Sequence, residues 1–285
     1  IVLVDSNTAA RYEDSTSTSS IFAWGANFSS TNQKVFNSTS GSLHRSFAPT
    51  LKSYSSDQPR FEFDPASDGQ SVGSGTALGL LVESQATNYN TKSEDIAGWS
   101  APGNMTISAN AMVAPNGTLT ADVLTVSDDT VASGHFAYRS VTGGSSGDSV
   151  AVSFYAKSTG VDKLYFYDAG GGSNLSIFNL ADGTVSFSNS ANSKITDCGN
   201  GWYHCVGVYT LVGGSPNLRF YSYNGTTTTY IASGYDGFAL WGVQVEIGVS
   251  SESSYISTSG STVSRASDSC SLVSAPLLDN GSGGL

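Results

Sequence analysis

Alternation between apolar and polar positions dominates the chain from about residue 59 onward and predicts β-strands joined by tight turns. Turn signals such as AGGGSN, ADGT and GGSPN separate the apolar segments. At least eight strands at this spacing favour an all-β, antiparallel β-sandwich of the jelly-roll, concanavalin A-like class. The clearest strands are residues 77–84, 148–158, 162–169, 175–180, 184–189, 202–211, 217–224 and 237–248.

The pattern also divides the chain into three regions. Residues 1–58 are irregular and rich in Ser, Thr and Asn, and we interpret them as an N-terminal assembly or attachment region. Residues 59–268 carry the predicted β-sandwich domain. Residues 269–285 include LLDNGSGGL and are expected to form a flexible tail or a linker. The first four residues, IVLV, resemble a strand, and a strand at a free terminus can pair with a sheet edge of another subunit.

The amino-acid composition is consistent with a β-strand protein, and the net charge excludes some classes of binding partner. Charged residues make up 12% of the chain, aromatic residues 11%, and there are 32 Gly but only two Met. The formal net charge of -11 argues against nucleic acid or anionic lipid as a partner. No segment approaches the roughly 18 consecutive apolar residues of a membrane-spanning helix. The chain begins at Ile1 without a signal-like segment, so we expect a processed secreted protein or a piece of a longer one.

Three predicted strands place tyrosine beside a cation on the face opposite their inward apolar positions, which include Leu164, Phe166, Leu218 and Phe220. Flat rings with hydrogen-bonding neighbours suit the apolar face and hydroxyl edge of a sugar, and a rigid sheet holds them at low entropic cost. Glycan binding, a subunit interface and plain packing all remain open interpretations. The candidate residues are Tyr155, Tyr165, Tyr167, Arg219, Tyr221 and Tyr223, with Lys157 and Lys163 beside them.

The stretch GFALWGVQVEIG at residues 237–248 reads as a closing strand. Regular alternation places Trp241 and the alternate aliphatic residues after it on the inner face, with Gln244 and Glu246 on the other. We interpret this Gln and Glu as bonding backbone or neighbouring strands at the outer or edge side of the sheet rather than a ligand. A buried Glu246 paired with Arg265 would make the stretch a clasp to the C-terminal segment.

Catalytic and metal-binding patterns are weak. The Gly-x-Ser-x-Gly matches GQSVG (69–73) and GGSSG (143–147) fall in predicted loops, and the three histidines have no evident carboxylate partner. Glu62 and Asp64 alternate in FEFDPAS and offer the two carboxylates of a glycoside hydrolase. No thiolate-imidazole cluster predicts a metal centre, and no cofactor is expected, although DPASDG (64–69) offers oxygen ligands to calcium.

Cysteines and glycosylation motifs bear on the extracellular interpretation. Cys198 and Cys205 flank GNGWYH, whose turn would bring them together across adjacent strands as a disulfide. The alternative is that all three cysteines are small buried hydrophobes. If a glycosylating host secretes the protein, seven Asn-x-Ser/Thr motifs are candidate acceptors. They are Asn27, Asn37, Asn104, Asn116, Asn174, Asn224 and Asn280.

Several segments, in order, carry a resemblance to a known family. They are PRFEFDP (59–65), LGLLVESQATN (78–88), APNGTLTADVL (114–124), SFYAKS (153–158), GNGWYHCVGV (199–208), LWGVQVEIG (240–248) and SSYISTSGSTVSRASD (253–268). Together they resemble the carbohydrate-binding-like, concanavalin A-like sandwich domain of bacteriophage virion proteins, found in tail fibres and in head or baseplate decorations. The resemblance implies a jelly roll, a non-enzymatic surface role and self-assembly. It supplies no catalytic or ligand-binding residue.

Three functional hypotheses follow. The first is a self-assembling structural protein of the extracellular space or the virion surface, whose sandwich serves glycan binding or host adhesion. The second is a secreted, glycosylated subunit of an extracellular fibril that polymerises through its N-terminal strand. The third is a glycoside hydrolase that uses Glu62 and Asp64.

Overall fold

The computed structural model places most of the predicted sandwich. In the part of the chain that the structure describes, the residues form strands and turns and no helix. No membrane-spanning helix is therefore found among these residues. The predicted N-terminal region 1–58 lies outside the described residues, as does the tail 269–285 apart from Ser269. The described residues are 61–64, 76–127, 132–170, 173–186, 193–232 and 236–269, with the backbone alone at 61–64, 76–79, 102–103 and 173–175.

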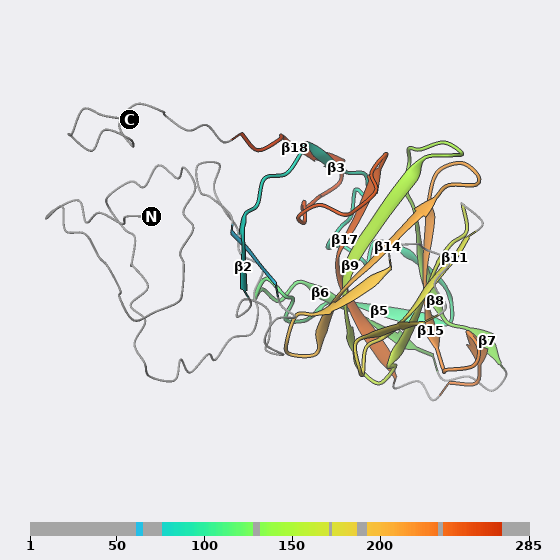
Figure 1. The fold of residues 1–285 in the computed structure, drawn as a ribbon. Helices are drawn as coiled ribbons and strands as arrows, with labels where there is room; N and C mark the ends of the chain where they lie inside the picture. The colour runs from blue at the N-terminus through green and yellow to red at the C-terminus, as the bar shows by residue number, and fades with distance from the viewer. Residues whose placement is uncertain are drawn as a thin grey trace, which may run out of the picture.

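Two six-stranded antiparallel sheets pack face to face (Figure 1), which confirms the predicted all-β sandwich. In the first, which we call the tyrosine sheet, the strand order is β12-β11-β10-β15-β8-β4. Burial alternates along β10 and β15, so these two strands bury only one face. Its strands are β4 (Ser100–Gly103), β8 (Phe136–Ser140), β10 (Lys163–Asp168), β11 (Ser173–Asn179), β12 (Thr184–Ser186) and β15 (Asn217–Tyr223).

The second sheet, which we call the clasp sheet, has the order β13-β14-β9-β17-β6-β5. All residues of β17 except Ile247 are buried, and β9 is buried from Val150 to Ala156. Both faces of this sheet are therefore covered along β9 and β17. Its strands are β5 (Met105–Met112), β6 (Ala121–Val126), β9 (Ser149–Ser158), β13 (Lys194–Asp197), β14 (Trp202–Thr210) and β17 (Gly237–Ile247).

Three short strand pairs complete the described fold, and the chain beyond one of them borders the clasp sheet. β17 pairs with β6 only over its first part, and the chain that follows β3 runs along its second part. There, Tyr89 N donates to Val245 O at 2.8 Å, and Val243 N donates to Ser93 O at 2.9 Å. The pairs are β1 (Phe61–Asp64) with β2 (Thr76–Leu80), β3 (Ala86–Asn88) with β18 (Val263–Arg265), and β7 (Ser133–Gly134) with β16 (Thr229–Tyr230).

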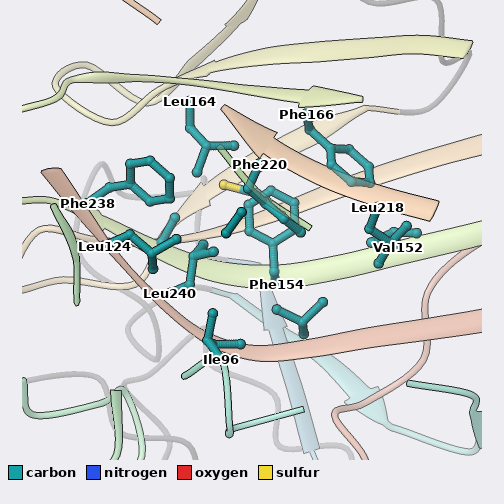
Figure 2. Packing of buried hydrophobic residues seen from close by; sticks show 14 of the residues in the cluster. Ile96, Leu124, Val152, Phe154, Leu164, Phe166, Leu218, Phe220, Phe238 and Leu240 are labelled. Atoms are coloured by element: carbon teal, nitrogen blue, oxygen red, sulfur yellow. The ribbon is translucent and has the colours of Figure 1, made fainter. Parts of the chain in front are cut away.

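Phenylalanine rings from both sheets form the centre of the core (Figure 2). The ring of Phe154 on β9 meets Phe220 on β15 edge-on, with centroids 4.9 Å apart, and Phe178 on β11 at 5.4 Å. Each is fully buried, and burying one such side chain contributes about 1.5–3 kcal/mol. The prediction that Phe166 and Phe220 point inward is confirmed, as it is for their neighbours Leu164 and Leu218.

The hairpin predicted around Gly199–Gly201 is present, but the predicted Cys198–Cys205 disulfide is wrong: both residues are free thiols. Cys205 pairs with Ile195 across β13 and β14, whereas Cys198 N donates to Trp202 O at 2.8 Å. Ile195 and Cys198 are three positions apart, an odd number, and successive residues of a strand face opposite ways. Cys205 therefore lies in the core between the sheets, and Cys198 packs against a cluster on the outer face.

We expect Cys198 and Cys205 to be recovered as separate thiols. Burial raises the pKa of Cys198 to about 11 and that of Cys205 above its ordinary value, so both stay protonated and react slowly in the native protein. Alkylation without a reducing agent, before and after unfolding, followed by peptide mass spectrometry, should label both cysteines fully only after unfolding. A peptide pair linked through these two residues would contradict the register described here.

Candidate functional site

The outward face of the tyrosine sheet is the candidate functional site. Its side chains are partly exposed, in contrast to the covered outer face of the clasp sheet. The antiparallel register of β10, β15 and β8 brings residues far apart in the sequence into adjacent positions on one face. We call the following set the aromatic face: Phe136, Tyr138, Lys163, Tyr165, Tyr167, Arg219, Tyr221 and Tyr223.

These residues form rows across the strands. In the middle row Tyr165 is opposite Tyr221, which in turn is opposite Phe136. Tyr221 and Phe136 stack with centroids 4.7 Å apart and an interplanar angle of 29°, and Tyr165 lies 5.9 Å from Tyr221. Along β10 the rings of Tyr165 and Tyr167 are nearly parallel at 11°, with centroids 6.5 Å apart. Mutual packing therefore holds the rings in place before any ligand arrives.

Arg219 occupies the centre of the next row, between Tyr167 and Tyr138. Its Cζ lies 5.5 Å from the ring centroid of Phe136, 5.9 Å from that of Tyr138 and 6.0 Å from that of Tyr167. These are cation–π distances. Nε donates to Asn217 Oδ1 at 3.2 Å, and Nη1 donates to Tyr221 Oη at 3.4 Å. The guanidinium is thus held by rings and neutral oxygens.

The Tyr165 hydroxyl is a neutral hydrogen-bonding group of this face. Partial burial raises the pKa of Tyr165 above its ordinary value, and the neighbouring Tyr167, Tyr221 and Tyr223 raise it further. A phenol with a raised pKa stays protonated at neutral pH and can both donate and accept a hydrogen bond. The face therefore combines flat apolar rings with hydroxyl edges.

The structure brings together five of the six candidates proposed from the sequence, but the prediction that Tyr155 points outward with them is wrong. Tyr155 is on β9 of the clasp sheet and is only 7% exposed. Its ring stacks on His204 at 4.7 Å and lies 5.6 Å from Trp241. Desolvation accordingly raises its pKa. Alternation identified its side of the strand correctly, but that side is covered by other residues.

Two members of the aromatic face were missed in the sequence. Phe136 and Tyr138 belong to β8, which was not among the expected strands. The signal was present in HFAYRS, where Phe136 and Tyr138 alternate with the buried Ala137. The segment is five residues long and lacks a second buried aliphatic position, so its alternation is short.

A β-bulge in β17 overturns the predicted alternation of GFALWGVQVEIG. The register against β9 shifts between Trp241 and Gln244, and Gly242 has a φ of 63°, a backbone conformation that favours glycine. Trp241 consequently lies in the outer-face cluster rather than on the inner face, whereas Val243 and Val245 do point into the core. The extra residue also keeps Gln244 and Glu246 on the outer face.

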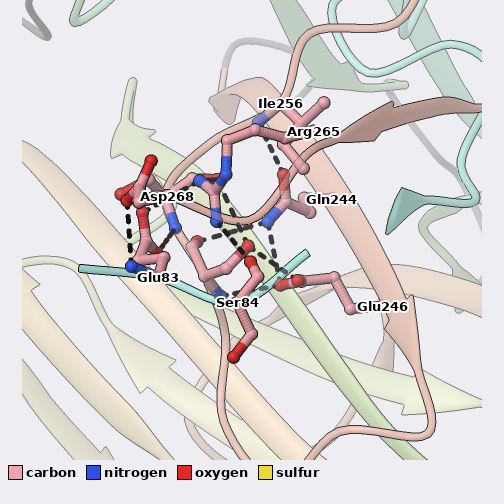
Figure 3. Close-up of polar contacts among 9 residues, drawn as sticks. Glu83, Ser84, Gln244, Glu246, Ile256, Arg265 and Asp268 are labelled. Atoms are coloured by element: carbon pink, nitrogen blue, oxygen red, sulfur yellow. Dashed lines mark hydrogen bonds and ion pairs between the residues drawn. The ribbon is translucent and has the colours of Figure 1, made fainter. Parts of the chain in front are cut away.

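Gln244 and Glu246 bind the chain that follows β17 (Figure 3). Glu246 is 2% exposed, and its Oε2 accepts hydrogen bonds from Gln244 Nε2 at 2.9 Å and Ser253 N at 2.8 Å. Its Oε1 accepts from Ser253 Oγ at 2.7 Å. Gln244 Oε1 accepts from Ile256 N at 2.7 Å. These two side chains thus satisfy backbone groups of a non-strand segment that lies over the sheet.

Arg265 joins the same region through a partner other than the expected Glu246. Its Nη1 forms an ion pair with Glu83 Oε2 at 2.9 Å and donates to Ser254 O at 3.3 Å. Glu83 Oε1 accepts from Ser254 N at 2.7 Å, and Glu83 N donates to Asp268 Oδ2 at 2.9 Å. We call Glu83, Gln244, Glu246, Arg265 and Asp268 the clasp. It ties the entry of the sandwich to its C-terminal segment (Figure 3).

The remaining sequence candidates fall outside the aromatic face or outside the described set. Glu62 and Asp64 are on β1, where the backbone alone is described, and most of DPASDG lies outside the described residues. Within the described ranges, no group of three or more His, Cys, Asp or Glu is placed to hold a metal ion.

Four of the seven glycosylation motifs fall on described residues, three of them in turns or loops and one on a strand. Asn104 and Asn224 are exposed, and Asn224 Oδ1 accepts from Thr226 N at 2.9 Å. Asn116 is partly exposed and Asn174 is on β11, where the backbone alone is described. The other three acceptors, Asn27, Asn37 and Asn280, lie outside the described residues.

Comparison with known proteins yields distant structural likenesses. No protein-family model matches the sequence, and no curated protein is significantly similar to it. The enzymatically active domain of tailspike protein 4 from bacteriophage CBA120 is 16% identical with a TM-score of 0.34, over 56% of this chain and 21% of that chain. The CBM22-2 xylan-binding domain of Xyn10C from Paenibacillus barcinonensis is 12% identical with a TM-score of 0.33, over 57% of this chain and 97% of that chain. At these TM-scores neither likeness assigns a ligand or an activity to this chain.

Glu246→Ala tests the clasp. The substitution removes the acceptor of Ser253 N and one of the two acceptors of Gln244 Nε2, and we expect the free energy of unfolding to fall by about 2–4 kcal/mol. Chemical denaturation provides the measurement. The control is Asp162→Ala, which removes an exposed carboxyl and should change the free energy of unfolding by less than about 1 kcal/mol. Equal effects of the two substitutions would show that the clasp does not stabilise the sandwich.

Proposed function

We propose that this chain is a non-enzymatic surface protein of the extracellular space or the virion, and that its aromatic face binds carbohydrate. The observation that carries the proposal is the set of preorganised rings on the open side of the tyrosine sheet, where Tyr165, Tyr221 and Phe136 form one row. A contiguous, partly exposed cluster of aromatic rings on one face of a sheet supports a binding site over ordinary sheet surface.

The chemistry of the face matches that of a sugar. The C–H face of a pyranose packs on an aromatic ring, while hydroxyl groups at its edge bond to the phenols of Tyr165 and Tyr221 and to Arg219. Adjacent strands are about 4.8 Å apart, so the three-residue row spans about 10 Å. A flat platform of this width suits the ring of a sugar unit in a polysaccharide.

The polar residues of the face support binding rather than hydrolysis. A glycoside hydrolase requires two carboxyl groups on either side of the scissile bond. Among the described outward residues of β8, β10 and β15, none is Asp or Glu, and Asp168 at the end of β10 is fully buried. The third hypothesis, hydrolysis by Glu62 and Asp64, would require a second site away from this face.

The second candidate for the aromatic face is a contact between copies of this chain. Tyr and Arg are enriched at the centre of protein interfaces, and this face contains five Tyr and Arg219. Self-assembly of a fibre or a secreted fibril through this surface would bury the same rings that a glycan would contact. The two candidates predict different effects of the same substitution.

Tyr221→Ala and Tyr165→Ala test the proposal. Each removes a ring from the middle row, and we expect the affinity for a polysaccharide bound by the wild type to fall about tenfold or more. Affinity electrophoresis against a polysaccharide panel, followed by titration calorimetry, provides the measurement. Tyr203→Ala, which removes a partly exposed Tyr from the clasp sheet, is the matched control and should leave affinity unchanged.

The oligomeric state of the same variants separates the two candidates. Analytical ultracentrifugation should give the same mass for Tyr221→Ala and wild type if the face binds glycan. An oligomer that dissociates in Tyr221→Ala, together with unchanged polysaccharide affinity, would contradict glycan binding and assign the face to self-assembly.

A further inference from the structure

The aromatic face has an electrostatic character opposite to that of the whole chain. The chain contains 12 Lys and Arg against 23 Asp and Glu. Nevertheless, the described outward residues of β8, β10 and β15 include two cations, Lys163 and Arg219, and no carboxyl group. A surface that carries only positive charge in an acidic protein indicates a ligand with negative charge.

Arg219 is oriented for such a ligand. The rings of Phe136 and Tyr138 flank its guanidinium, and Asn217 Oδ1 and Tyr221 Oη take two of its hydrogen bonds. No carboxyl group of the described residues pairs with it, and Nη2 donates no hydrogen bond to them. The planar fork of an Arg matches the two oxygens of a carboxylate or sulfate group. Because the side chain is already held, little further order is lost on binding.

Lys163 provides a second positive charge at the other end of the face. It is opposite Tyr223, four positions along β10 from Tyr167, the residue opposite Arg219. Four residues of an extended strand span about 13 Å. The aromatic rings of Tyr165 and Tyr221 lie in the row between the two cations. This order of cation, rings and cation fits a chain in which acidic groups alternate with apolar sugar faces.

We propose that the ligand of the aromatic face is an acidic polysaccharide, one that carries carboxylate or sulfate groups. The inference rests on the proposed glycan-binding function. An acidic group of one sugar binds the Arg219 guanidinium, a neighbouring sugar ring packs on Tyr221 and Phe136, and a more distant acidic group lies near Lys163. The net charge of -11 opposes approach over long distances. At physiological salt, however, screening limits exposed charges to about 8 Å, and the local cations then determine the contact.

Matched polysaccharides that differ only in charge test this inference. We expect wild type to bind polygalacturonate at least tenfold more tightly than its fully methyl-esterified form, and dextran sulfate more tightly than dextran. The two pairs distinguish carboxylate from sulfate recognition, and a preference for the acidic member of either pair supports the proposal. Calorimetry at constant ionic strength provides the affinities.

Substitutions then assign the preference to the two cations. Arg219→Gln should reduce affinity for the acidic polysaccharide about tenfold and leave affinity for a neutral one nearly unchanged. Arg219→Lys, which keeps the charge but loses the fork, should give an intermediate loss, and Lys163→Gln a smaller loss than Arg219→Gln. Lys157→Gln on the clasp sheet is the charge-matched control and should have no effect. Thermal unfolding of each variant verifies that the sandwich is intact.

The contrary outcomes are distinct. Binding of neutral and acidic polysaccharides with equal affinity, still abolished by Tyr221→Ala, would overturn the charge preference and leave the proposed glycan function in place. An acidic preference that Arg219→Gln, Arg219→Lys and Lys163→Gln all leave unchanged would also overturn the inference. Failure of every polysaccharide in the panel to bind would overturn both proposals together.

Discussion

The bulge at Gly242 sets the arrangement on which the clasp sheet depends. Without the extra residue, the alternation that buries Phe238 and Leu240 in the core would also direct Gln244 and Glu246 into it. With it, the later part of β17 contributes Val243 and Val245 to the core instead. Gln244 and Glu246 remain on the outer face, where they bind the 253–256 segment. Because β17 is central in its sheet, one backbone irregularity determines both the core and the cover.

This cover explains why, among the described residues, the clasp sheet offers a less open outer face than the tyrosine sheet. The outer side of the clasp sheet is occupied by packed side chains such as Trp202, Trp241 and Tyr255, and by the clasp itself. The buried Gln244 and Glu246 side chains within it have hydrogen-bond partners, as burial requires. The tyrosine sheet has no equivalent cover among the described residues, and its outward positions hold rings that pack on one another. We therefore infer that binding and structural roles are divided between the sheets.

The sequence predicted correctly which side chains face the core in strands where the alternation of apolar and polar residues is uninterrupted. In β10 and β15 the strict period of two predicted both the buried Phe220 and the outward Tyr221. Prediction from alternation failed where burial or pairing depends on contacts between residues far apart in the sequence. Tyr155 is buried on the outer face of its sheet by residues such as Tyr255, a hundred positions away in the sequence. The disulfide prediction was wrong because the strand register places Cys198 and Cys205 on opposite faces of the sheet. Gly within a strand is a recognised signal for a bulge, so the shift at Gly242 was the most predictable of these features.

The most direct test of glycan recognition by the aromatic face is to observe its rings during binding. In solution NMR with assigned aromatic resonances, titration with polygalacturonate oligosaccharides should shift the ring signals of Tyr165, Tyr221 and Phe136. The signals of Tyr155 and Tyr255, which are packed on the clasp sheet, should remain unchanged. Saturable shifts that appear on the clasp-sheet residues and spare the aromatic face would contradict the assignment of the site.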